Sequence, residues 1–229
     1  MYLFPVLTKK YWFITIYFGL CLCSPWLNKL VDYLSAKDFM ALLKVFFGLF
    51  VLLPTLGFVL NFPSVTEDAG YGLANFCFLY LVGRFIRLHL HLCYNRKVYL
   101  FVYIFTMLAL GCFQVVYSKI LGFHFTALLS YDTLFVFVGS VALFLYFKEL
   151  QFRSIWINKL ATCSLAVYVL HLHPLTFEWL FSNVLQVKEY QGWLYLACLF
   201  LVPVPIYLIC FLIETVRKSL WKMVGLSDS

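Results

Sequence analysis

The sequence contains seven apolar runs, and each is long enough to cross a lipid bilayer as a helix. Crossing the ~30 Å hydrocarbon layer takes about 20 helical residues, and a helix satisfies its own backbone hydrogen bonds there. Hydrophobic residues make up 64% of the 229 positions and charged residues 12%, too few for the surface of a soluble domain. The runs lie at about 11–27, 39–61, 71–92, 98–118, 127–147, 155–182 and 191–213. We therefore expect an all-α, polytopic integral membrane bundle with about seven transmembrane helices, in which residues 1–229 form a single membrane domain without a soluble part.

Basic residues are distributed unevenly between the two sides of these expected spans. Of 17 Lys and Arg residues, 12 lie in the 28–38 turn, the 84–97 region, the 148–159 turn and the C-terminal tail. Alternating spans place these four segments on one side, and the side richer in Lys and Arg is cytoplasmic. The sequence thus predicts a multi-pass protein of the cell membrane with a cytoplasmic C-terminus. The net charge of +7 then belongs to the loops and does not indicate nucleic-acid binding.

The third apolar run carries four polar side chains on one helical stripe. Tyr80, Arg84, Arg87 and His91 follow i, i+4, i+7, i+11 spacing and fall within about 60° of one another. Arg84 lies ~18 Å along the expected helix, where an arginine costs at least ~2.5–3.5 kcal/mol. We therefore predict that Arg84 faces an aqueous cavity, a carboxylate or an anionic ligand. The alternative is that both arginines snorkel to cytoplasmic phosphates, and Arg87 fits either reading.

The sixth run places a histidine near a proline. Tyr168 and His171 share a helical face, His173 points elsewhere, and Pro174 is expected to kink or break the helix. A histidine in this setting can be a hydrogen-bonded structural group or a catalytic base, and both readings stay open. In the fifth run, Asp132 or Thr133 is expected to cap a helix.

The remaining motifs exclude several kinds of site. The eight cysteines form no CxxC pair, and no metal-ligand cluster, phosphate-binding loop or nucleophile elbow occurs, so we expect no metal site and no permanently bound cofactor. The residues alone indicate a cavity with an arginine-rich cytoplasmic side and an outer side that carries histidine and tyrosine. An enzyme that uses a polyanionic donor fits this pattern. A non-enzymatic transporter of glycan or lipid precursors fits it as well.

Three phrases in this order resemble acyltransferase family 3, the bacterial membrane acyltransferases that O-acylate cell-surface sugars. They are LFPVLTKKYWFITIYFGLCLCSPWLNKLVDYL near the N-terminus, YLVGRFIR over residues 80–87, and INKLATCSLAVYVLHLHPL over residues 157–175. The resemblance covers essentially the whole chain. It implies an enzyme that moves an acetyl or other acyl group from acyl-CoA, with acetyl-CoA the expected donor. The implied acceptor is a sugar hydroxyl of a surface polysaccharide or of its lipid-linked precursor.

The resemblance also implies that the chain lacks about three N-terminal helices of the family, including the helix that carries the histidine held to be catalytic. Lys9 and Lys10 agree, because seven spans would leave them on the outer side, whereas ten would place both ends in the cytoplasm. An incomplete and inactive copy is therefore one expectation. A separate N-terminal chain, a second copy of this chain and membrane lipid are the expected partners.

The candidate site residues follow from position and chemistry rather than from a family motif. Arg84, Arg87 and His91 are predicted to contact the phosphates of acyl-CoA, since arginine pairs bidentately with phosphate. Tyr168 and His171 are the candidates on the acceptor side, where a histidine could activate a hydroxyl. The identity of the catalytic base stays open.

Overall fold

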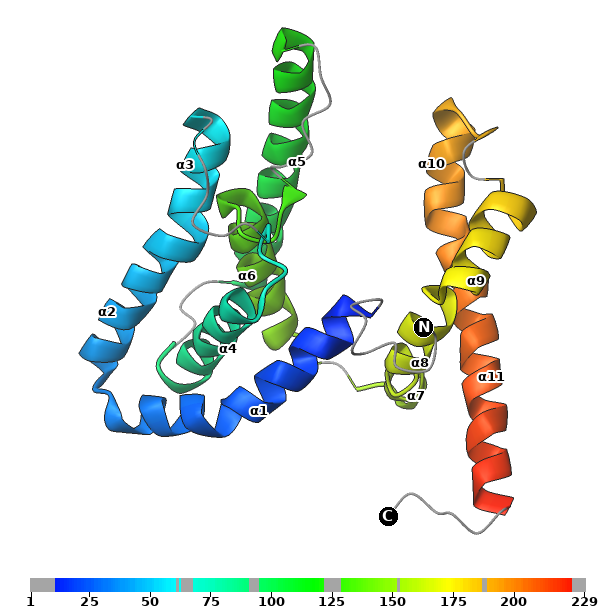
Figure 1. The fold of residues 1–229 in the computed structure, drawn as a ribbon, viewed down its shortest axis with the longest axis horizontal. Helices are drawn as coiled ribbons and strands as arrows, with labels where there is room; N and C mark the ends of the chain where they lie inside the picture. Colours follow the sequence, from blue (N-terminus) through cyan, green and yellow to red (C-terminus); the bar gives the residue numbers. More distant parts are fainter. Residues whose placement is uncertain are drawn as a thin grey trace. The chain divides into compact units, whose positions relative to one another are not determined.

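The computed structural model describes residues 11–60, 62, 68–90, 95–121, 129–151, 153–186 and 189–223. Within these ranges the regular structure is helical and includes no strand, which confirms the all-α prediction (Figure 1). The chain divides into two compact units, residues 1–151 and residues 152–229. A single membrane domain over the whole chain stays a prediction, and the two units are described separately.

The described residues of the first unit form helices and one π-helical segment. Its elements are α1 (Trp12–Tyr33), α2 (Ala36–Phe47), the π-helical segment η1 (Gly48–Leu52), α3 (Leu53–Leu60), α4 (Leu73–Leu88), α5 (Arg96–Leu121) and α6 (Leu134–Lys148). The second unit contains α7 (Ile155–Ala161), α8 (Ser164–His171), α9 (Pro174–Glu178), the π-helical segment η3 (Trp179–Val184), α10 (Gly192–Leu201) and α11 (Pro203–Met223).

In the described part of the chain, four helical segments are long and apolar enough to cross a membrane. They are Trp12–Tyr33, Ala36–Leu60, Arg96–Ile120 and Gly192–Met223, and Leu134–Lys148 is a shorter apolar helix. The chain is thus a membrane protein with several apolar helices, while the number of seven spans stays a prediction. The expected run 155–182 is not one continuous helix. It breaks at Thr162–Cys163 and again at Leu172–His173, and Pro174 begins the next helix, as expected for a residue without a backbone N–H.

In the first unit, two prolines of the described residues lie inside helical segments, and the local structure compensates for each. Pro25 cannot donate to the carbonyl of Cys21, and the Ser24 hydroxyl donates to that carbonyl instead, at 2.9 Å. Helix α1 therefore continues to Tyr33, six residues beyond the expected run. Pro54 follows η1, where the wider π turn removes the need for a regular hydrogen bond.

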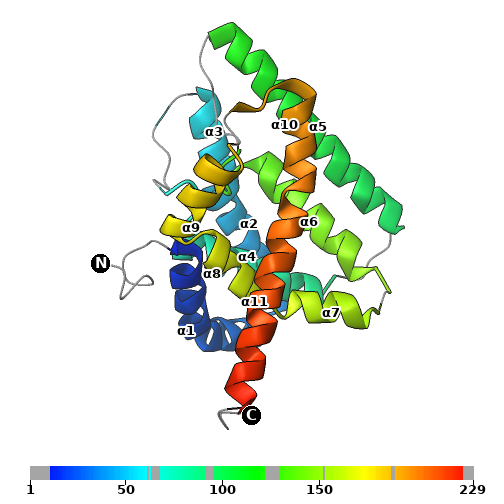
Figure 2. The same cartoon turned by 90° about the vertical axis from the view of Figure 1, so that its right-hand side faces the viewer.

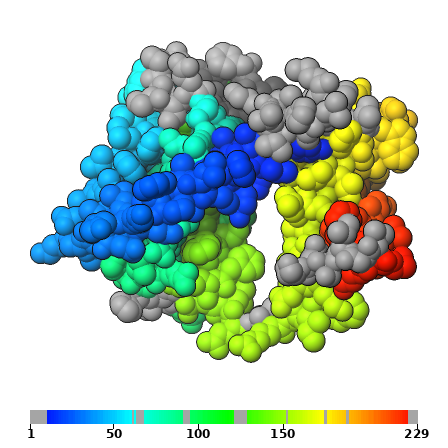
Figure 3. Space-filling view, turned by 60° about the horizontal axis from the view of Figure 1, so that its bottom comes forward, coloured from blue at the N-terminus to red at the C-terminus, as the bar shows by residue number. Residues whose placement is uncertain are grey.

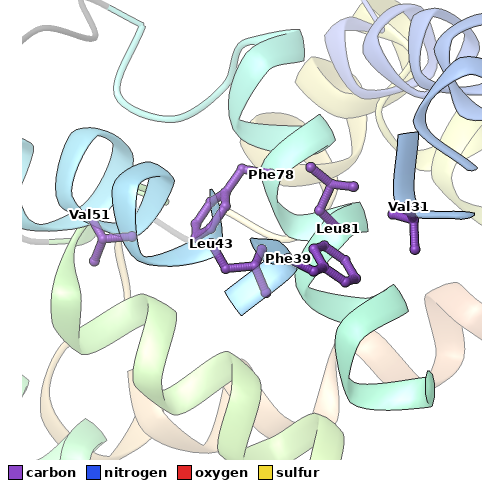
Figure 4. Packing of buried hydrophobic residues seen from close by; sticks show 6 residues of the cluster. All are labelled: Val31, Phe39, Leu43, Val51, Phe78 and Leu81. Carbon is purple, nitrogen blue, oxygen red and sulfur yellow. The ribbon is translucent and has the colours of Figure 1, made fainter. Parts of the chain in front are cut away.

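The core of the first unit lies between α2, η1 and α4. Its buried members are Val31, Phe39, Leu43, Val51, Phe78 and Leu81 (Figure 4). Phe39 and Phe78 are at most 1% exposed, and Phe78 stacks against Phe50 and Phe137 with ring centroids 6.0 and 5.5 Å apart. Within lipid, helices associate through close van der Waals packing, and aromatic pairs of this kind contribute about 0.5–1.5 kcal/mol each. This packing holds α4 in place.

Helices α1, α4 and α6 of the first unit run in the same direction. At one end, the Trp12 ring lies 4.6 Å from Tyr71 and 6.0 Å from Tyr131, which precede α4 and α6. At the other end, Asp32 of α1 pairs with Arg84 of α4, and Lys148 of α6 reaches the carbonyl of Ile86. Figure 3 shows α1 lying across one face of this unit. The 28–38, 84–97 and 148–159 segments thus begin at the same end of the bundle, as alternating spans predict.

Helix α6 begins with a capping contact that comes from another helix. Thr133 occupies the expected N-cap position, but its side chain makes no capping bond to the first turn, and its hydroxyl donates to Ser130 O at 2.9 Å. The Thr55 hydroxyl of α3 instead accepts a hydrogen bond from Leu134 N at 2.9 Å. The expected N-cap position at Thr133 is confirmed, but the hydroxyl that accepts from Leu134 N comes from α3, and a single sequence cannot reveal a capping contact with a distant helix.

The second unit is organised around α11. Helix α8 packs against α11, and α10 leads into α11 (Figure 2). The Tyr207 hydroxyl donates to Leu160 O at 2.7 Å and lies 3.2 Å from the Ser164 hydroxyl. Since Leu160 lies at the end of α7 and Ser164 starts α8, one tyrosine joins α11 to both helices.

Candidate functional site

A cavity of about 370 Å³ lies in the first unit, at the end where α4 and α6 finish. It is lined by Tyr80, Gly83, Arg84, Ile86, Arg87, Phe144 and Lys148. We call it the cationic cavity, because three of these residues are arginine or lysine. The structure thus brings Tyr80, Arg84 and Arg87 to one cavity, in line with the i, i+4, i+7 stripe. That they bind a ligand stays a prediction.

Of the three cations that line this cavity, Arg84 is the least exposed. Its side chain is 23% exposed, and Nη2 lies 4.0 Å from Oδ1 of Asp32, whose side chain is 70% exposed. A pair at this distance with one exposed partner contributes only about 0–1 kcal/mol. The Nε atom of Arg84 is buried and has no hydrogen-bond partner among the described residues. A buried N–H group without a partner is destabilising, so this guanidinium can gain from an additional acceptor.

The Tyr80 hydroxyl is held in place one turn before Arg84. It donates a hydrogen bond of 2.8 Å to Oδ1 of Asn28 in α1. Because its proton is used in this bond, the phenolic oxygen can only accept a further hydrogen bond from a ligand. Asn28 and Asp32 are one turn apart on α1, so both contacts come from the same helical face.

Lys148 is a cation of this cavity that the sequence did not single out. It is the last residue of α6, and its Nζ donates a hydrogen bond of 3.2 Å to the backbone carbonyl of Ile86. That carbonyl is one of the last in α4 and has no amide partner in its own helix. Only the packing of α6 against α4 could have revealed this position.

A second, apolar cavity of about 170 Å³ adjoins the first. It is lined by Leu79, Val82, Gly83, Ile86, Ser140, Val141 and Phe144. Three of these residues, Gly83, Ile86 and Phe144, also line the cationic cavity. A Cβ atom added at Gly83 would meet no atom within 4 Å, so the glycine leaves open space where the two cavities meet. The site therefore offers a cationic part and an apolar part side by side.

The other predicted residues of this stripe are placed as follows. Arg87 is exposed at the surface end of the cationic cavity. His91 lies outside the described residues. His89, which the spacing places off this stripe, is exposed, and its ring packs against Phe85 and Phe39 with centroids 5.2 and 6.1 Å apart, as suits an interfacial residue.

The acceptor-side candidates lie in the second unit, and Tyr168 and His171 are neighbours there. Their rings are perpendicular, with centroids 6.5 Å apart, and both side chains are half-buried. His171 Nδ1 lies 2.6 Å from the carbonyl oxygen of Val167. A carbonyl can only accept, so Nδ1 carries the proton. In the neutral ring Nε2 then has a free lone pair and can take a proton from a hydroxyl.

The described residues contain no group of three or more His, Cys, Asp or Glu side chains that could hold a metal ion. The chemistry available in the two units is therefore that of cations, hydroxyls and an imidazole. Cations of this kind bind phosphate groups through charge-assisted hydrogen bonds.

A comparison with models of known protein families found a match for this chain. A family model described as an acyltransferase domain matches residues 2–213, which is nearly the whole chain. No curated protein matches, and no solved structure matches.

Proposed function

The chain belongs to this acyltransferase family, and on that premise we propose that it takes an acetyl or similar acyl group from acyl-CoA and transfers it to a sugar hydroxyl. The proposed acceptor is a surface polysaccharide or its lipid-linked precursor. The membrane helices and the family together make the protein a membrane acyltransferase. The donor, the acceptor and the residues that contact them are the proposal.

The observation that carries the donor assignment is the cationic cavity. Arg84, Arg87 and Lys148 line a space of about 370 Å³ without an acidic side chain among its described lining residues. The diphosphate and the phosphomonoester of CoA are the polyanionic groups that such a cavity suits. Arginine supplies paired N–H donors to phosphate, and lysine supplies a point charge. The unpaired Nε of Arg84 is one donor that a phosphate oxygen would satisfy.

The apolar cavity beside it suits the rest of the donor. CoA joins its phosphates to a thioester through a largely uncharged arm, so a donor site needs an apolar part next to a cationic one. Gly83, Ile86 and Phe144 border both cavities and would lie along this arm. Ser140 is the hydroxyl-bearing residue of the apolar cavity, where it can form a hydrogen bond with an amide of the arm.

The transfer itself needs a base for the acceptor. The hydroxyl oxygen attacks the thioester carbonyl carbon, the new C–O bond forms, and the C–S bond breaks to release the CoA thiolate. The hydroxyl proton ends on the thiolate, so CoA leaves as the thiol. Within the second unit, His171 Nε2 has the lone pair that a base for the acceptor hydroxyl needs. The carbonyl of Val167 holds the imidazole in the tautomer that this role requires.

We also propose that the C-terminus after Leu212 lies in the cytoplasm, where acyl-CoA is found. Arg217, Lys218 and Lys222 close to the end of α11 support this orientation. A reporter that is active only in the cytoplasm should be active when it is fused to the C-terminus. Activity only of a reporter that requires the outer side of the membrane would reverse the assignment.

The test is acyl transfer in membranes that contain the protein. Membranes are incubated with radiolabelled acetyl-CoA, and both free CoA thiol and label in the cell-envelope polysaccharide are measured. We expect label transfer with the wild-type chain and strong loss in the double variant R84Q/R87Q. The matched double variant R96Q/K97Q removes the same charge from the first turn of α5, outside the cavity, and should retain the activity.

Two outcomes would contradict the proposal. Equal activity of both double variants would remove the cationic cavity from the donor site. Uptake or release of a glycan or lipid precursor without any acyl transfer would instead identify a transporter.

A further inference from the structure

The second unit contains a basic cavity that the proposed reaction does not use. It lies between α7 and the last turns of α11 and has a volume of about 330 Å³. Three lysines and three hydroxyl groups line it. These residues are Lys159, Lys218, Lys222, Thr162, Thr215 and Ser219. We call it the lysine cavity.

The lysine cavity has a net positive charge. No acidic residue is among its described lining residues. The carboxylate of Glu214, one turn before Lys218, accepts two hydrogen bonds from Arg217, from Nε at 2.7 Å and from Nη2 at 2.8 Å. Lys218 lies 3.6 Å from the same carboxylate, which leaves Lys159 and Lys222 without an acidic partner among the described residues. The cavity therefore has at least two cations whose charge is not balanced.

Each hydroxyl group of the lysine cavity donates its proton to a backbone carbonyl oxygen of its own helix or turn. Thr162 donates to Lys159 O at 2.8 Å, Thr215 to Phe211 O at 2.8 Å, and Ser219 to Thr215 O at 2.9 Å. Each hydroxyl oxygen keeps a lone pair and can accept a hydrogen bond from a ligand. A fitting ligand thus combines an anionic group, for the lysines, with hydroxyl groups of its own, for these oxygens.

The surroundings of the cavity are those of a membrane boundary. Helix α7 exposes Ile155 and Trp156, which are 75% and 72% exposed, and exposed tryptophans of this kind mark the level of lipid headgroups. Lys159 Nζ lies 5.3 Å from the Trp156 ring centroid, so the cation stays close to that level. Helix α11 belongs to the apolar segment Gly192–Met223, and Lys218 and Lys222 lie in its last turns.

We propose that the lysine cavity binds the headgroup of an anionic phospholipid that carries free hydroxyl groups, such as phosphatidylglycerol. The lysines contact the phosphate, and the hydroxyl oxygens of Thr162, Thr215 and Ser219 accept from the glycerol hydroxyls. The acyl chains lie along the apolar surface of α7 and α11. A bound lipid joins the two helices, which makes it a structural ligand of this unit. The inference is independent of the acyl-donor site in the first unit.

A soluble phosphate could offer the same groups without the acyl chains. The exposed apolar side chains beside the cavity favour the lipid, because they give its chains a surface that a soluble ligand cannot cover. A comparison of phosphatidylglycerol with glycerol 3-phosphate separates the two sources, since they share the phosphate and hydroxyl chemistry.

The experiment is a lipid titration of the full chain, followed by native mass spectrometry from mixed micelles. Phosphatidylglycerol, phosphatidylcholine and glycerol 3-phosphate are added separately, and bound ligand is counted. The test variant is K159Q/K222Q, which leaves the ion pairs of Glu214 intact. The control is K37Q/K97Q, which removes two exposed lysines from the first unit. A further variant, K159R/K222R, keeps the charge and checks that the unit still folds.

We expect phosphatidylglycerol to bind the wild-type chain, the K37Q/K97Q variant and the K159R/K222R variant alike. Binding to K159Q/K222Q should be weaker by roughly 30-fold, from about 1 kcal/mol for each lysine. Phosphatidylcholine should bind weakly to all four. Equal losses in the two glutamine variants, or loss in the arginine variant, would overturn the proposal. Displacement of the lipid by glycerol 3-phosphate at equal concentration would also contradict the proposal, because it would identify a soluble phosphate as the ligand of this cavity.

Discussion

Lys148, the last residue of α6, donates a hydrogen bond of 3.2 Å to the backbone carbonyl of Ile86 in the last turn of α4. This contact places its ammonium group in the same cavity as the guanidinium groups of Arg84 and Arg87. Three like charges around one space repel one another, and a bound anion would offset this repulsion. The arrangement is therefore suited to binding a polyanion.

Substitution of Lys148 tests the contribution of the third cation. Lys148→Met should weaken CoA binding by roughly ten-fold, because a charged hydrogen bond to phosphate contributes about 1.5–3 kcal/mol and part of it is already used on Ile86. Lys148→Arg should keep most of the affinity. Isothermal titration of the purified variants measures both, and equal affinity of the methionine variant would place Lys148 outside the donor site.

Asp32 should oppose anion binding, because its carboxylate pairs with Arg84 at 4.0 Å. Asp32→Asn should therefore tighten CoA binding by about two- to five-fold, in line with an exposed pair of up to about 1 kcal/mol. Asp38→Asn removes the same charge from the first turn of α2 and serves as the control. If Asp32→Asn weakens binding, the carboxylate helps to position Arg84 rather than competing for it.

Gly83 lies where the cationic and apolar cavities meet, and a larger side chain there should shorten the accessible apolar space. Gly83→Leu should slow transfer from octanoyl-CoA by about ten-fold more than transfer from acetyl-CoA. Gly111→Leu on α5 also points into open space but lines neither cavity, so it should leave the chain-length preference unchanged. An identical preference in both variants would remove the acyl group from the apolar cavity.

His171 is proposed as the base, so its loss should affect the chemical step and not donor binding. His171→Ala should lower the transfer rate by about 10²–10⁴-fold at unchanged CoA affinity. His171→Gln can still donate to Val167 O but cannot take a proton, and it should be as slow as the alanine variant. Added imidazole should restore part of the rate in the alanine variant. His173→Ala is the matched control, and equal loss there would point to a structural effect.

Local patterns predicted the features that depend on one helix. The spacing of Tyr80, Arg84 and Arg87 is enough to place them on one face, and Pro174 is enough to predict a helix break. The depth of Arg84 indicated that it needs a partner, and the structure provides Asp32. In each case the determining interactions lie within a few turns of the same segment.

Contacts between helices could not be predicted in this way. Lys148 looks like an ordinary cation at the end of a span until α6 packs against α4. The amide of Leu134 is capped by Thr55, which is 79 positions away in sequence. The hydrogen bond from Tyr80 to Asn28 spans 52 positions. Such contacts depend on the three-dimensional packing of large aromatic side chains, for which a single sequence gives no distances.

The most direct test of the account is the affinity of CoA for the purified chain and its Arg84 variants. Arg84→Ala should weaken binding by roughly ten- to a hundred-fold, because a charged contact to phosphate of about 1.5–3 kcal/mol is lost. Arg84→Lys should lose less, since it keeps the charge but not the paired donors. Arg96→Ala, an exposed arginine outside the cavity, should bind like the wild-type chain. Equal affinities for all four proteins would contradict the assignment of the cationic cavity as the donor site.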